Sequence, residues 1–94
     1  MSEQAQDPLI RQLREQISDA DRTIVDAINK RLQLVSRLKS YKESRGVSFV
    51  DPEREEWMFQ YLSRTNRGPL SGDGLREIFQ QILDLTKREV DREG

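Results

Sequence analysis

The sequence has 94 residues, of which 34% are hydrophobic and 35% charged, and 16 basic and 17 acidic residues give a net charge of -1. Because the opposite charges are interleaved along the chain, no basic face suggests a nucleic-acid partner. The chain has no cysteine and no histidine, which excludes disulfides, thiolate nucleophiles, histidine bases and the usual soft metal sites. Any chemistry must use Arg, Lys, Asp, Glu and hydroxyl groups, and we expect neither a metal nor a cofactor.

No apolar run approaches about 18 residues, and the N-terminus lacks the apolar core of a signal peptide, so we expect no membrane span and a cytoplasmic protein. The length predicts a single domain over residues 1–94. The hydrophobic content is low for a chain that must build its own core.

The first predicted element is a long helix over about residues 9–45, preceded by a polar segment, residues 1–7, that we expect to be frayed. A helix of about 36 residues is roughly 54 Å long, which exceeds a compact monomer of this size, so we expect a partner chain and favour an identical one. Apolar residues recur along it at steps of three and four, the spacing of one helical face. They are Ile10, Leu13, Ile17, Ala20, Ile24, Ile28, Val35 and Leu38.

Two cations, Arg31 and Lys42, lie on this same apolar face. They are about three turns, or roughly 16 Å, apart and point the same way, so their long side chains can converge on one small ligand. Arg14 is about 25 Å from Arg31 along the helix and cannot serve that ligand within one straight helix. If two copies of the helix lie antiparallel, however, Arg14 of one chain comes near the Arg31–Lys42 half of the other, which gives two equivalent sites per dimer.

A second helix is predicted over about residues 52–64. Asp51 suits the N-cap, Pro52 the first helical position, and Glu53 and Glu55 the positive end of the helix dipole. Residues 47–50 before it are predicted to form an extended loop that packs inward.

A third helix is predicted over about residues 73–92, after a break at residues 66–69 and a cap at residues 71–73. The predicted fold class is therefore all-α, with three helices per chain. The apolar stripe of the third helix consists of Leu75, Ile78, Phe79, Ile82, Leu85, Thr86 and Val90.

Simple structural explanations exist for each of these charges. A single cation near an apolar seam is most often a side chain that extends to water at the edge of an interface. Arg54 and Glu55 can be solvated charges of a first turn, and Trp57 and Tyr61 are better explained as core or interface aromatics than as ligand platforms. Like charges gathered in one interior, by contrast, imply an anion with more than one negative group.

Four stretches together resemble the all-helical chorismate mutase family. They are Leu13–Ser18 with Asp21, Lys30–Arg31, Lys39–Lys42 and Asp51–Glu55. No single stretch is specific, but the set of spacings is, and the resemblance extends from about residue 9 to residue 90. It implies an intertwined homodimer that rearranges the dicarboxylate chorismate to prephenate in aromatic amino acid biosynthesis.

The resemblance also implies roles for individual residues. Arg14, reaching from the partner chain, and Arg31 correspond to the arginines that hold the two carboxylates of chorismate. Lys42 corresponds to the lysine that bonds a carboxylate and the ether oxygen of the breaking C–O bond.

Four further positions match the binding site of the family, and a fifth departs from it. Asp51 and Glu55 correspond to the acids near the substrate hydroxyl, and Arg54 to a residue that supports a carboxylate. Thr86 falls where the family has a serine near a carboxylate. Val90 departs from the pattern, because many members have a glutamine or a protonated glutamate there that donates a second hydrogen bond to the ether oxygen. This departure predicts low intrinsic activity.

Three alternatives remain open at the level of the sequence. Isochorismate pyruvate lyase shares the fold and the cations. The segment Val50–Met58 and the Gly68-Pro69 break resemble mutase domains attached to the synthase that begins the shikimate pathway, which suggests a regulatory or partner-activated domain. The third alternative is a dimeric helical bundle with no ligand.

Overall fold

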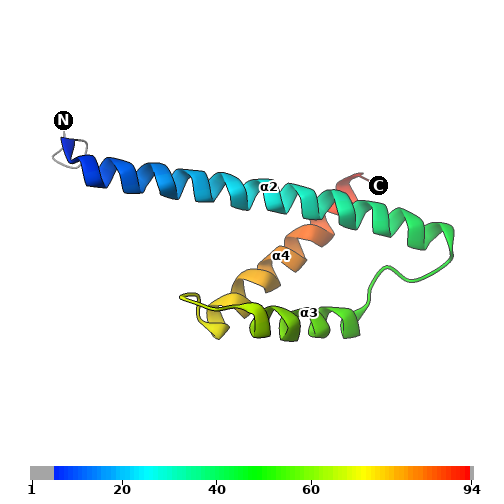
Figure 1. Ribbon diagram of the computed structural model, residues 1–94. Coiled ribbons are helices and arrows are strands. Elements are labelled where there is room, and N and C mark those ends of the chain that lie inside the picture. Colours follow the sequence, from blue (N-terminus) through cyan, green and yellow to red (C-terminus); the bar gives the residue numbers. More distant parts are fainter. Residues whose placement is uncertain (1–5, 94) are drawn as a thin grey trace. The chain divides into compact units, whose positions relative to one another are not determined.

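The computed structural model describes residues 6–93 of the chain. These residues form three long helices, α2 (Pro8–Ser44), α3 (Pro52–Thr65) and α4 (Gly72–Glu93), and no strand occurs among them (Figure 1). The all-α prediction and the predicted bounds of the helices are thus confirmed to within one or two residues. None of the helices in this part of the chain is long and apolar enough to cross a membrane. The chain divides between Gln33 and Leu34 into two compact units, and α2 contributes residues to both.

Local features of the chain set both ends of α2: a capping carboxylate at the start and a glycine after the end. The Asp7 carboxylate accepts from the backbone N–H groups of Leu9 at 2.9 Å and Ile10 at 3.3 Å, so Asp7 acts as a cap. The prediction that residues 1–7 are frayed is therefore wrong for Asp7, and residues 1–5 lie outside the described residues. At the other end Gly46 has a φ of 67° and ends the helix as predicted, because its left-handed conformation reverses the chain.

The part of α2 in the first unit, residues 8–33, has its apolar face exposed. Leu9, Leu13, Ile17 and Ile24 are 47% to 60% exposed, and α2 as a whole contains no buried residue. The predicted apolar residues therefore share one face of the helix, but nothing within residues 8–33 buries them.

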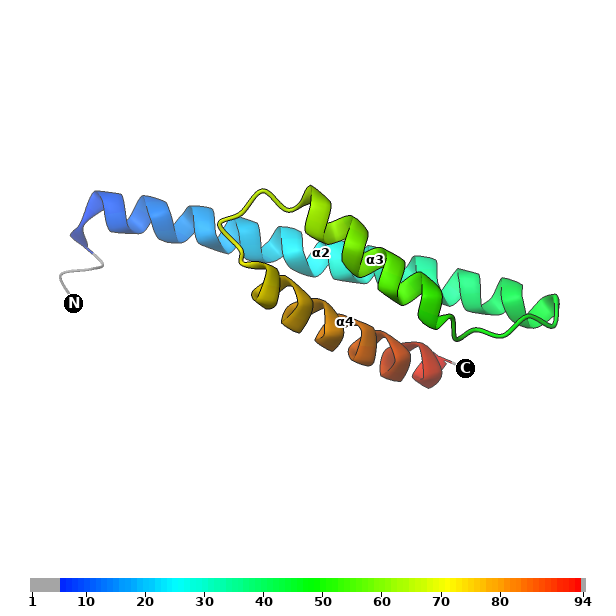
Figure 2. The same ribbon diagram turned by 90° about the horizontal axis from the view of Figure 1, so that it is seen from below.

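The second unit, residues 34–94, contains the core. Within it α3 and α4 are joined by a short connection and pack against each other (Figure 2). Phe59 of α3 is 5% exposed, and Leu75, Leu83 and Val90 of α4 are 3% to 7% exposed.

The predicted stripe of α4 needs one correction. Ile78 is 49% exposed, whereas Leu83, which was not assigned to the stripe, is buried at 7%. Apolar residues cover two adjacent faces of α4, and only the face that carries Leu75, Leu83 and Val90 is fully covered. Periodicity alone does not show which of two neighbouring faces becomes the core.

Caps position α3 and α4 as predicted. The Asp51 carboxylate accepts from the N–H of Arg54 at 3.2 Å, and Pro52 occupies the first turn of α3. The Ser71 hydroxyl accepts from the N–H of Gly74 at 3.0 Å at the start of α4. In the connection Asn66 binds the backbone at two points, since its side chain donates to the Leu70 carbonyl and accepts from the backbone of residue 68.

Candidate functional site

Lys42 lies in the last turn of α2, half-buried beside the loop that leads to α3. Its Nζ donates to the carbonyl oxygen of Phe49 at 3.4 Å. The prediction of an inward-packing loop holds for Phe49, which is half-buried, but not for Val47 and Val50, which are 53% and 58% exposed. Lys42 also borders a hollow of about 290 Å³, lined by Leu38, Tyr41, Lys42, Arg45 and Val47. The predicted cation is therefore at the edge of an apolar surface.

A second lysine, which the sequence did not single out, lies one helical turn before Lys42. The Nζ of Lys39 is 3.1 Å from Oδ1 of Asp91 and 5.9 Å from the centre of the Phe49 ring. The side chain of Lys39 is only 20% exposed, whereas that of Asp91 is 74% exposed. The end of α2 and the end of α4 are thereby connected within the second unit. In the sequence Lys39 was part of the Lys39–Lys42 stretch of the family resemblance, and its three-residue spacing from Lys42 places the two side chains on neighbouring positions of the helix.

Arg54 at the start of α3 lies against an aromatic pair. Its guanidinium is 4.1 Å from the centre of the Trp57 ring, and Trp57 stacks on Tyr61 with ring centres 5.1 Å apart and an interplanar angle of 6°. The two rings are 44% and 45% exposed, so in this chain by itself they are not core aromatics. Arg54 is held by a cation–π contact in this arrangement.

Glu55 pairs with Lys87 of α4, with 3.2 Å between Oε1 and Nζ. The carboxylate side chain is 32% exposed and the lysine 46% exposed, so the pair stabilises the fold by no more than about 1 kcal/mol. Its effect is positional, because it connects the first turn of α3 to the turn of α4 that also carries Thr86. Lys87 is a second cation that the sequence prediction missed.

Thr86 and Val90 lie one turn apart on the buried face of α4, where they are 6% and 3% exposed. The Thr86 hydroxyl donates to the Ile82 carbonyl at 2.6 Å. Val90 has no polar side-chain atom and cannot donate a hydrogen bond. The departure seen in the sequence is thus located in the interior of the second unit.

Arg14 and Arg31 belong to the part of α2 in the first unit. Arg14 is exposed and Arg31 is half-buried. Burial lowers the pKa of the Arg31 guanidinium from its usual value, because removal from water disfavours the charged form. The pKa of an arginine is high enough for the group to stay charged, and a nearby anion would offset the cost of that burial.

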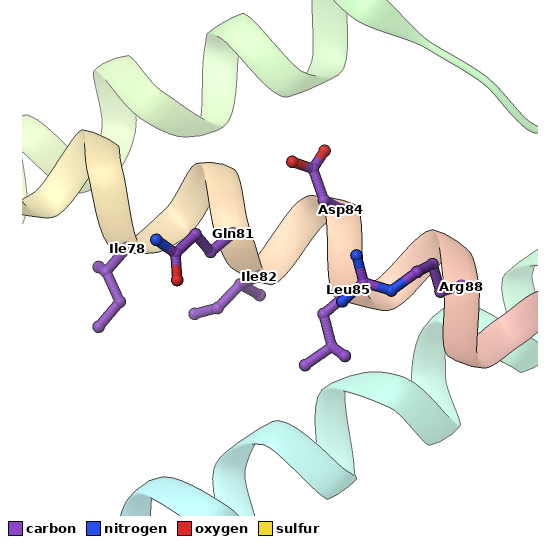
Figure 3. A pocket seen from close by; sticks show the side chains of 6 residues that line it. All are labelled: Ile78, Gln81, Ile82, Asp84, Leu85 and Arg88. Atoms are coloured by element: carbon purple, nitrogen blue, oxygen red, sulfur yellow. The ribbon is translucent and has the colours of Figure 1, made fainter.

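A hollow of about 410 Å³ lies along α4. It is lined by Ile78, Gln81, Ile82, Asp84, Leu85 and Arg88. Figure 3 shows Ile78, Ile82 and Leu85 on one side of the helix, with Asp84 pointing to the opposite side. This is the second apolar face of α4, and none of the predicted site residues lines it. Among the described residues no cluster of acidic side chains is suited to hold a metal ion.

Comparison with known proteins gives a consistent family assignment. Residues 13–90 match the family model described as chorismate mutase type II. The chain is 33% identical over 79 residues to a bifunctional chorismate mutase/prephenate dehydratase of Stutzerimonas stutzeri, covering 79% of this chain and 22% of that protein. It is 28% identical over 75 residues to the T-protein of Haemophilus influenzae, covering 79% of this chain and 20% of that protein. The chain thus spans about a fifth of the length of these relatives.

Two solved structures of the chorismate mutase of Thermus thermophilus are similar along nearly their whole length. The form II structure has a TM-score of 0.83 and 29% sequence identity, and the match covers 88% of this chain and 94% of that chain. The form I structure has a TM-score of 0.79 and 30% identity, covering 82% of this chain and 96% of that chain. The three-helix architecture is therefore shared with proteins of very similar size.

Proposed function

Because the chain belongs to the chorismate mutase type II family, we propose that it is an isomerase that rearranges chorismate to prephenate in aromatic amino acid biosynthesis in the cytoplasm. The observation that carries this proposal is the similarity to the Thermus thermophilus mutase, which covers 94% of that chain at a TM-score of 0.83. The similarity includes all three helices and not only a local motif. The second unit also contains lysine side chains and carboxylate side chains, which supports the proposed activity.

The chemistry needs few kinds of side chain. The rearrangement is pericyclic, so one C–O bond breaks and one C–C bond forms within the same molecule, without proton transfer or a covalent intermediate. A protein accelerates such a reaction by holding the compact reactive conformer and by placing cations where negative charge develops on the ether oxygen. Lys42 is the cation at the ether oxygen, and Arg31 holds a carboxylate. A chain without histidine or cysteine is suited to this task.

Around the substrate, the helices of the second unit supply the remaining contacts. Asp51 and Glu55 approach the substrate hydroxyl, and Arg54 moves from Trp57 to support a carboxylate. Thr86 lies near a carboxylate of the substrate. Each role follows from the family pattern, and the positions of Glu55 and Thr86 on adjacent turns of packed helices support it.

The active unit is an intertwined homodimer in which Arg14 of one chain completes the site of the other. The exposed apolar face of residues 8–33 supports this arrangement. Leu9, Leu13, Ile17 and Ile24 are 47% to 60% exposed in the single chain, and a second copy of the same helix would cover them.

Chorismate consumption by the purified dimer tests the proposal. We expect saturable turnover with prephenate as the product, and a loss on the order of 10²- to 10³-fold in kcat for Lys42→Ala. Isochorismate is run in parallel, and release of pyruvate from it alone would identify a lyase instead. A folded dimer that consumes chorismate at the uncatalysed rate, with or without Lys42, would contradict the proposal.

A partner-dependent mutase is the second candidate. The relatives in which the match occupies about a fifth of the length are longer proteins, and two of them are named as bifunctional enzymes, so a mutase unit that works beside a second enzyme is a known arrangement. A separate synthase of the shikimate pathway is the partner that the sequence suggests. Adding that synthase to the assay should raise kcat/KM if the unit is partner-activated, whereas binding without any turnover would indicate a sensor of chorismate or prephenate.

A further inference from the structure

We propose that Lys39 is a second cation of the Lys42 site and that it contacts the substrate beside Val90, where the chain has no hydrogen-bond donor of its own. This inference rests on the proposed mutase function and goes further by assigning a substrate contact to a residue outside the predicted site. Its basis is the placement of Lys39, Lys42 and Phe49 at one end of the second unit.

The burial of Lys39 is the first observation. Its side chain is 20% exposed, whereas the cations of four other ion pairs, Arg22, Arg76, Lys87 and Arg92, are 46% to 77% exposed. A surface lysine that binds nothing extends its ammonium group into water. Lys39 instead withdraws most of its side chain from water and places its Nζ on Asp91 near the end of α4.

Phe49 connects the two lysines. Its carbonyl oxygen accepts from Lys42 at 3.4 Å, and its ring lies 5.9 Å from the Nζ of Lys39. Residues three apart on a helix also have neighbouring side chains, with about 5–6 Å between their Cβ atoms. The two ammonium groups therefore converge on one residue of the loop, and together they suit a ligand with two negative groups.

The position of Asp91 shows how far Lys39 reaches. The Nζ of Lys39 lies 3.1 Å from the Asp91 carboxylate, which directly follows Val90 in sequence. Lys39 thus spans from α2 to the turn of α4 that carries Val90. The side chains of Val90 and Asp91 project about 100° apart on the helix, so Lys39 reaches the Val90 position only after it leaves Asp91. Because the Asp91 side chain is 74% exposed, water can replace Lys39 as its partner, and a dianionic substrate can take the lysine.

With both lysines at the substrate, the site has two ammonium groups for the charge that develops on the ether oxygen. An ammonium group donates hydrogen bonds and carries a full charge, so it can replace an amide donor in this role. The contact is electrostatic: Lys39 neither gives up a proton nor forms a covalent bond with the substrate.

The test compares Lys39→Ala and Lys39→Gln with Arg37→Ala in the chorismate assay. Arg37 is an exposed cation on the same turn of α2 and serves as the matched control. We expect kcat to fall on the order of tenfold or more for both Lys39 variants and to stay within about twofold for Arg37→Ala. Circular dichroism and the dimer mass are recorded for each variant. If the alanine variant folds poorly, Lys39→Gln provides the comparison, because its side chain is polar and only one atom shorter than that of lysine.

Two further variants separate a substrate contact from a structural tie. Asp91→Asn breaks the ion pair but leaves Lys39 in place, so it should keep kcat, whereas a loss equal to that of Lys39→Ala would show that only the ion pair matters and would overturn the proposal. Val90→Gln in the Lys39→Ala background should restore part of the lost kcat. Wild-type protein without turnover would contradict the mutase function itself, whereas active wild type with unchanged Lys39 variants would overturn only the role of Lys39.

Discussion

The two units of the chain solve the problem of burial differently. The second unit buries Phe59, Leu75, Leu83 and Val90 to exposures of 7% or less within one chain. The helix of residues 8–33 also has apolar residues at the spacing of one helical face, yet Ile17 and Ile24 are 59% and 55% exposed. The difference indicates that the second unit can maintain its own structure, whereas the first depends on contacts from outside, which we have proposed to come from an identical chain.

A charge on the exposed stripe of residues 8–33 should have the largest effect on the protein. Ile24 and Val25 are both 55% exposed, but only Ile24 lies on the stripe. We expect Ile24→Asp to give a monomer with turnover near the uncatalysed rate, because a carboxylate in a helix interface is costly. Val25→Asp should keep the dimer and most of the activity. Light scattering and the chorismate assay measure both properties. Equal behaviour of the two variants would show that the stripe is not the dimer interface.

Mixed dimers show which chain supplies Arg14 to each site. Arg14→Ala and Lys42→Ala dimers, each with little activity, are unfolded together and refolded. Random pairing makes about half of the dimers mixed, and each mixed dimer has one intact site of two if Arg14 acts across the interface. The expected activity is therefore about a quarter of the wild-type value.

If Arg14 instead serves the site of its own chain, every site in the mixture lacks one residue and activity stays at the level of the parent variants. Wild-type protein refolded in the same way is the control for the yield of active dimer.

The core of the second unit gives a prediction about stability. Leu83→Ala removes buried side-chain volume and should lower the free energy of unfolding by about 2–5 kcal/mol. Ile78→Ala, on the same helix but 49% exposed, should cost clearly less. Urea titrations at one fixed protein concentration compare them, because the stability of a dimer depends on concentration. Equal losses would show that Ile78 becomes buried in the assembled protein, and its face of α4 would then be an interface.

The parts of the fold that were predictable are those with local causes. Asp51 and Pro52 at the start of α3 and Gly46 at the end of α2 act on neighbouring backbone groups, so their residue types identify the ends of the helices. Asp7 has the same kind of local role, but the polar composition around it suggested fraying. Composition was the weaker indicator there, since one well-placed carboxylate satisfies two N–H groups.

The site was only partly predictable because its contacts join distant segments. Lys42 was found from its place on an apolar stripe and from the family pattern. The pairing of Lys39 with Asp91 and of Lys87 with Glu55 joins residues on different helices, and no spacing along the chain reveals such pairs. The face of α4 that is buried, with Leu83 in place of Ile78, likewise depends on how the second unit packs.

Substitutions of Asp51 should have milder consequences, because in the second unit this residue is both a helix cap and a proposed substrate contact. Its carboxylate caps α3 through the N–H of Arg54 at 3.2 Å. Asp51→Ala removes the cap and should cost about 1 kcal/mol of stability, whereas Asp51→Asn keeps a good cap and should keep stability. If the carboxylate also binds the substrate hydroxyl, Asp51→Asn should raise KM several-fold at unchanged stability, as measured by thermal melting and steady-state kinetics. An unchanged KM in Asp51→Asn would limit Asp51 to the cap, and the second unit would then have Glu55 as its only acid at the hydroxyl.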